Sequence, residues 1–170
     1  MIDLLATIGT IAPRHIEERT LPLLLSTLPD VAPPREAVAE RAKCWRILAT
    51  LSKLCTQADL FETLVGRLMT KLDLLCVRKG AVDVLAIDTE PTSAYAHAIL
   101  MTISQTLAAK AEKGHNDIAK HINKLVPHLY NLFFYSALMF NGRDVAATDY
   151  RVIGVAAQII TTIGQAVSTQ

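Results

Sequence analysis

The sequence TLPLLL at residues 20–25 returns 43 residues later as TLVGRL at residues 63–68. An aspartate follows each copy at the same offset, Asp30 after the first and Asp73 after the second. A third, looser copy is LVPHL at residues 125–129. A period of about 40–47 residues is typical of arrays in which each unit is a pair of helices. Each unit of such an array buries its apolar face against its neighbours.

The composition favours an all-α fold. The 170 residues are 51% hydrophobic, with 5% aromatic residues, 7 glycines and 7 prolines. The mean hydropathy is +0.31, which is too apolar for a disordered chain and sufficient for one core. We therefore predict a right-handed α-α superhelix of the HEAT or armadillo type. It would comprise about three helical hairpins and one extra N-terminal helix.

Apolar residues at 3.6-residue spacing predict where the hairpins lie. We place one extra helix at about residues 1–11 and hairpins at about 14–55, 56–113 and 116–168. Pro22 predicts a kink in the first hairpin, and Lys113-Gly114 predicts a helix end. The terminal helices lack a polar outer face, so we expect residues 1–170 to be one HEAT-repeat segment of a longer solenoid. Its exposed ends would then allow self-association.

Residues 77–91, VRKGAVDVLAIDTEP, interrupt this periodicity. The segment has no helical period, and charged residues are spread along it. Long loops in compact folds are usually functional or disordered. We predict a surface insertion that contacts a partner protein, with four candidate contact residues: Arg78, Lys79, Asp83 and Asp88.

Histidines cluster near the start of the last hairpin. His121 and His128 are seven residues apart, which is about 10.5 Å on a helix and too far for them to share one metal ion. Together with Asp117 and Lys124 they form a polar stripe opposite the apolar one. Such a stripe is by default a solvated face. His121, Lys124 and His128 are our further candidates for partner contact.

The sequence contains no recognisable catalytic motif. There is no GxSxG, Walker A, HExxH or GxGxxG pattern, and we expect no catalytic activity, no metal and no cofactor. The three cysteines, Cys44, Cys55 and Cys76, lie among core-spaced leucines, which predicts buried thiols. We predict that Trp45 is also buried.

Charge and hydropathy exclude two partner classes. Lys and Arg number 17 against 16 Asp and Glu, without the basic excess that direct nucleic-acid binding needs. The longest apolar run, residues 129–140, has 12 residues, whereas a membrane span needs about 20. We therefore expect neither direct nucleic-acid binding nor membrane insertion, and a soluble protein without a signal peptide.

Four stretches resemble one known family. They are LPLLLSTLPDVAPP at 21–34, WRILATLSKLCTQADLFETLVGRLMTKLDLLC at 45–76, AYAHAIL at 94–100 and LVPHLYNLFFYSA at 125–137. Together they resemble the MMS-nineteen (methyl methanesulfonate sensitivity) family of large HEAT-repeat proteins in DNA repair and transcription. The segment LSKLCTQADLFETLV carries the most specific likeness.

The resemblance implies an adaptor of the cytosolic iron–sulfur targeting machinery. Members of that family bind a WD40-propeller subunit and a small carrier protein. They dock the apo forms of client enzymes, such as DNA helicases and polymerases, which then receive iron–sulfur clusters. A cytoplasmic and nuclear location follows, and this chain would lie in the later half of the longer family protein.

Two alternatives remain open at this stage. Another HEAT scaffold, of the nuclear-transport or tubulin-binding type, would be expected to be more acidic or to carry basic or aromatic residues in its turns. A helical metal-dependent hydrolase would need several His and Asp residues that converge on a metal.

Overall fold

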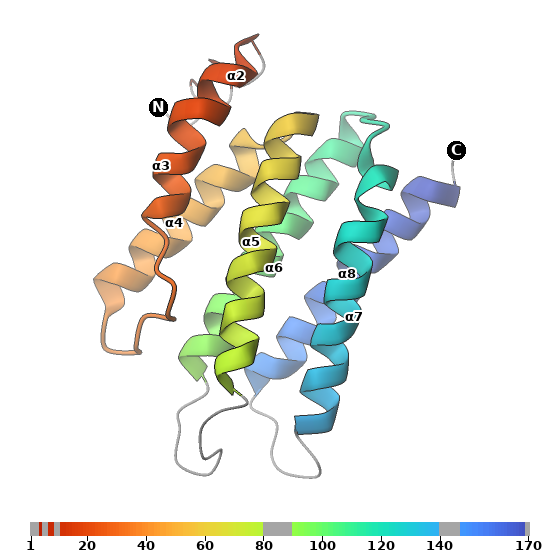
Figure 1. Ribbon diagram of the computed structural model, residues 1–170. Coiled ribbons are helices and arrows are strands. Elements are labelled where there is room, and N and C mark those ends of the chain that lie inside the picture. The colour runs from red at the N-terminus through yellow and green to blue at the C-terminus, as the bar shows by residue number, and fades with distance from the viewer. Residues whose placement is uncertain (1–3, 5–6, 9–10, 80–89, 140–146, 169–170) are drawn as a thin grey trace.

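The structure, a computed structural model, describes residues 4, 7–8, 11–79, 90–139 and 147–168 (Figure 1). Within these ranges the chain is helical and contains no strand, which confirms the predicted all-α class. None of the helices in the described ranges combines the length and the apolar character needed to cross a membrane.

The long helices form two layers (Figure 1). The front layer contains α3 (Leu21–Ser26), α5 (Ala58–Lys79) and α7 (Ile122–Met139). The back layer contains α4 (Val38–Leu54), α6 (Glu90–Glu112) and α8 (Ala147–Ser168). Within the back layer α6 packs against both α4 and α8, and within the front layer α5 contacts both α3 and α7. Each front helix also contacts the back helix that follows it in the chain.

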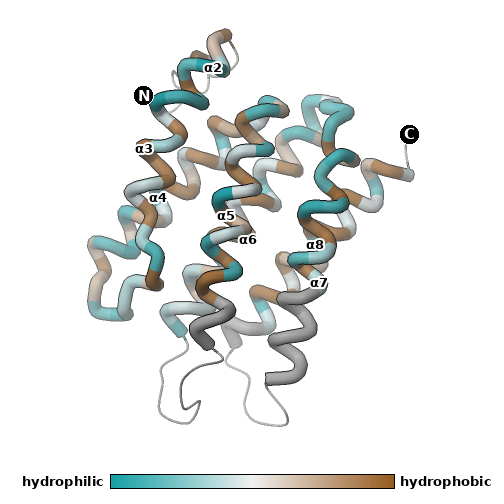
Figure 2. The backbone as a smooth tube through the Cα atoms, in the orientation of Figure 1, coloured by the Kyte–Doolittle hydropathy of each residue, from teal (hydrophilic) through white to brown (hydrophobic). Residues whose placement is uncertain are grey.

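The repeated leucines explain the front layer. Leu21 and Leu64, the first leucines of the two clear copies, are both fully buried, as is Leu125 in the third copy. The leucines four residues further on, Leu25, Leu68 and Leu129, are buried as well. An i, i+4 pair points to one face of a helix, so each copy turns the same two leucines inward. Figure 2 shows the resulting alternation of apolar and polar stretches along the helices.

The chain accommodates Pro22 by a wider helical turn. Before α3 lie the short helix α2 (Pro13–His15) and a π-helical turn, η1 (Ile16–Thr20). The N–H of Leu21 donates to the carbonyl of Ile16, five residues earlier. A proline ring clashes with the carbonyl four residues before it, and a wider turn relieves that clash. Of the predicted helix at 1–11, residues 4, 7, 8 and 11 are described, and they are helical.

The predicted end of α6 at Lys113-Gly114 is confirmed. Gly114 has a φ of +68°, in the left-handed region where glycine is favoured. Its N–H donates to the carbonyl of Ala111 at 3.0 Å, and the N–H of His115 donates to that of Lys110 at 3.0 Å. These two bonds make a Schellman C-cap, which satisfies the last carbonyls of the helix.

The insertion expected at 77–91 is shorter than predicted, because α5 extends through Lys79 and α6 begins at Glu90. Residues 80–89 lie outside the described residues. The thiols of Cys44 and Cys55 are buried as predicted, whereas the Cys76 side chain lies outside the described part.

The prediction that Trp45 is buried is wrong. The indole is 37% exposed, and the guanidinium of Arg41 lies 5.4 Å from the ring centroid. The inward face of α4 is occupied by Cys44, Leu48 and Leu51. Because successive helical residues are turned by about 100°, the residue next to Cys44 lies at the side of the helix.

Candidate protein-interaction surface

The predicted polar stripe on the last hairpin faces α5. His121 ends the 3-10 turn η2 (Ile118–His121) and is only 4% exposed. Its ring meets the ring of Phe61 edge-on, with 4.8 Å between centroids. The expectation of a solvated face is therefore wrong for His121, since the stripe packs against a neighbouring front-layer helix.

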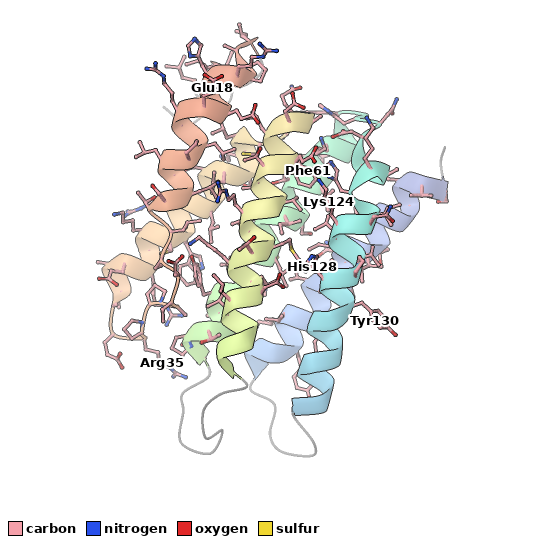
Figure 3. All side chains as sticks on the ribbon, viewed as in Figure 1. Glu18, Arg35, Phe61, Lys124, His128 and Tyr130 are labelled. Atoms are coloured by element: carbon pink, nitrogen blue, oxygen red, sulfur yellow. The ribbon has the colours of Figure 1, made fainter. Side chains whose placement is uncertain are left out.

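The other two stripe residues, labelled in Figure 3, contact acidic side chains of α5. Lys124 pairs with Glu62, and Nδ1 of His128 lies 3.4 Å from Oδ2 of Asp73. The hydrogen bond from Lys124, together with its charge, lowers the pKa of Glu62. Both pairs are solvent-exposed, so they align α5 and α7 but contribute little to stability.

A buried polar cluster lies where the second hairpin meets the third. Lys110, at the end of α6, is fully buried. Its ammonium donates to the carbonyl of Thr56 at 2.9 Å and to Oδ2 of Asp117 at 2.7 Å. The same ammonium lies 5.1 Å from the ring centroid of Phe61. One lysine thus joins the α4–α5 connection to the segment that begins the last hairpin.

The cluster shifts two pKa values downwards. Burial alone would raise the pKa of Asp117, but the hydrogen bond and charge of Lys110 outweigh it and leave that pKa below its usual value. Burial lowers the pKa of His121, and the attraction of Asp117, whose Oδ2 is 3.7 Å from Nε2, does not reverse the shift. The favoured state therefore has an ionised Asp117, which is bound to Lys110, beside a neutral His121.

This arrangement offers no metal-ligand set. Among the described residues, no group of three or more His, Cys, Asp and Glu side chains is placed to hold a metal ion. In the cluster around Asp117, the carboxylate is already paired with the ammonium of Lys110.

The remaining predicted contact residues lie at or beyond the end of α5. Arg78 and Lys79 belong to its last turn, and their side chains lie outside the described part. Asp83 and Asp88 lie outside the described residues altogether.

Sequence reasoning missed a groove of about 370 Å³ between α3 and α5. Its lining residues are Pro22, Leu25, Ser26, Asp30, Thr63, Arg67, Thr70, Lys71 and Leu74. Lys71 bridges the groove, since its ammonium donates to the carbonyl of Leu28 at 2.9 Å and to Oδ1 of Asp30 at 2.7 Å. Part of the signal for this groove is in the repeat itself, since Pro22 lies in the first copy and Arg67 in the second.

Comparison with known proteins identifies the family. Residues 47–170, well over half of the chain, match the family model described as "RNAPII transcription regulator C-terminal". No curated protein and no solved structure matches the chain significantly. The matched residues include the C-terminal part of α4 and all of α5 to α8, and thus one wall of the α3–α5 groove. The chain belongs to the MMS-nineteen family, whose members are non-catalytic, scaffold-type proteins related to transcription and DNA repair.

Proposed function

We propose that this chain is a segment of an adaptor that docks apo client proteins to the cytosolic iron–sulfur targeting complex. The family match over residues 47–170 is the observation that carries the proposal. The matched family model describes a C-terminal region, which supports a position in the later half of the family protein. The segment works by protein–protein contact and transfers no chemical group.

The arrangement of the helices supports a scaffold. Three front-layer helices run side by side over three back-layer helices (Figure 1), and the two leucines that lie four residues apart in each repeat copy build the core. Repeats of this kind present long surfaces to partners. We extend this arrangement to a right-handed superhelix that continues along the family protein.

The contact residues are part of the proposal. The exposed side chains of Lys124 and His128, on the front layer, lie on a surface that a partner reaches without unfolding. The segment that includes Arg78, Lys79, Asp83 and Asp88 is the second proposed contact. The partners are the WD40-propeller subunit, the small carrier protein and apo client enzymes, in the cytoplasm and the nucleus.

Affinity capture from cell extract tests this function. The tagged chain is incubated with extract, and the retained iron–sulfur targeting subunits and client enzymes are quantified by mass spectrometry. An unrelated HEAT-repeat domain of similar length is the control. We expect enrichment of the propeller and carrier subunits over that control. Equal recovery with both baits would contradict the proposal.

A further inference from the structure

We propose that the groove between α3 and α5 binds a short peptide segment of a partner protein, in which a carboxylate and a bulky aliphatic side chain lie about 10 Å apart. This inference rests on the proposed scaffold function and adds the chemistry of the bound segment. It is drawn from the groove's lining residues, which differ from the contact residues predicted from the sequence.

Arg67 is the residue that we expect to bind the carboxylate of the peptide. Its side chain lines the groove and is exposed, and no hydrogen bond or ion pair joins it to any other described residue. The second cation of the groove, Lys71, is already bound to Asp30 and to the carbonyl of Leu28. Guanidinium groups bind carboxylates with two parallel hydrogen bonds. The groove therefore has one uncommitted positive charge, suited to one carboxylate.

Leu74 is the residue that we expect to contact the aliphatic side chain of the peptide. It is 49% exposed, whereas its neighbours Leu72 and Leu75 are buried in the core. Pro22 and Leu25 add apolar surface from α3. Covering a half-exposed leucine removes apolar surface from water, at about 25 cal/mol per Å². A bulky aliphatic side chain gains most from that contact.

The spacing along α5 limits the shape of the segment. Arg67 and Leu74 are seven residues apart, about 10.5 Å along the helix axis. A ligand that reaches both therefore carries its carboxylate and its aliphatic group about 10 Å apart. Two turns of a helix meet this condition, as do about three residues of extended chain.

The charge and size of the groove favour a peptide over a nucleic acid. Phosphate backbones are bound by several cations at once, and here one cation is uncommitted while Asp30 adds a negative charge. A volume of about 370 Å³ accommodates a few side chains, with the rest of the segment lying along the surface.

Selection from a phage-displayed library of random 12-residue peptides tests the inference without any iron–sulfur component. We expect the enriched peptides to combine Asp or Glu with Leu, Ile or Met at the stated separation. Their affinity should fall about tenfold or more in Arg67→Gln, because a charge-assisted hydrogen bond is lost. It should also fall in Leu74→Ser.

Two matched variants control for general effects. Arg46→Gln removes an exposed arginine from α4, and Leu23→Ser removes an exposed leucine from α3 outside the groove lining. Both should leave peptide affinity unchanged, and circular dichroism of all four variants should match that of the parent chain.

Three results would overturn the inference. The first is that no peptides are enriched. The second is that the enriched peptides bind Arg67→Gln and Leu74→Ser as tightly as the parent chain. The third is that a fluorescein-labelled DNA duplex binds in an Arg67-dependent manner. Loss of targeting-subunit capture with intact peptide binding would instead contradict the proposed function alone.

Discussion

The ammonium of Lys110 lies 2.7 Å from Oδ2 of Asp117, and both side chains are withdrawn from solvent. The same ammonium donates to the carbonyl of Thr56, 54 residues earlier in the chain. A single buried cation therefore connects three segments: the α4–α5 connection, the end of α6 and the start of the last hairpin. Because a buried charge without a partner is costly, the three segments depend on one another.

Lys110→Met should lower the free energy of unfolding by about 3 kcal/mol or more, since it leaves Asp117 and the Thr56 carbonyl without their buried partner. Urea unfolding followed by circular dichroism measures the change. The control is Lys124→Met, which breaks the exposed pair with Glu62 and should have a much smaller effect. Equal losses in the two variants would show that Lys110 has no special role.

Stability should fall as the pH is lowered below the usual histidine pKa of 6.5. Burial lowers the folded-state pKa of His121, and burial with the charge of Arg151 lowers that of His97. Between the folded and unfolded pKa values the unfolded chain binds more protons, so the free energy of unfolding decreases with falling pH. Below both values the loss is complete, and Asp117 adds a further decrease only as the pH falls through its own, lowered pKa.

The pH dependence has a specific genetic test. His121→Gln should flatten the slope of unfolding free energy against pH between about 7 and 5, and His97→Gln with His121→Gln should flatten it further. The readout is the slope, which a uniform loss of packing against Phe61 does not change. Lys124→Met should keep the parent slope. An unchanged slope in the double variant would show that His97 and His121 do not cause the pH dependence.

Leu64→Ala should destabilise the chain by about 3 kcal/mol, because it opens a cavity at a fully buried position of the repeat. Leu23→Ala removes the same atoms from a leucine that is 65% exposed, and its effect should stay within about 0.5 kcal/mol. Chemical unfolding of both variants compares them directly. Similar losses would mean that the repeat does not set the register of the core.

The chain alone should self-associate at high concentration. Tyr150 and Val167, on α8, are 64% and 42% exposed, and Ile153 and Ile160 beside them are half-buried. These side chains form an apolar edge that a second copy is able to cover. Sedimentation velocity across a concentration series should show a rising average mass, and Val167→Lys should suppress it. A strictly monomeric profile throughout would contradict this expectation.

The sequence predicted the front layer because the repeated leucines are periodic. Leu21, Leu64 and Leu125 are buried at equivalent positions, and a 3.6-residue period is enough to find them. The end of α6 was also predictable, since Gly114 is the residue type that a left-handed C-cap requires. Both features depend on residues close together in the chain.

The tertiary partners of polar residues were not predictable in this way. A stripe that contains His121, Lys124 and His128 has the same periodicity whether it faces water or another helix. Phe61, Glu62 and Asp73, which it meets, lie more than 50 residues earlier in the chain. The α3–α5 groove was not predictable for the same reason, because Arg67 and Pro22 come together only when the two repeat copies pack.

Isothermal titration of the purified chain with the purified propeller and carrier subunits, with and without an apo iron–sulfur client, tests the adaptor proposal most directly. We expect saturable binding of at least one targeting subunit, and a ternary complex when the apo client is added. No heat of binding with either subunit or with the client, from a chain whose circular dichroism is fully helical, would contradict it.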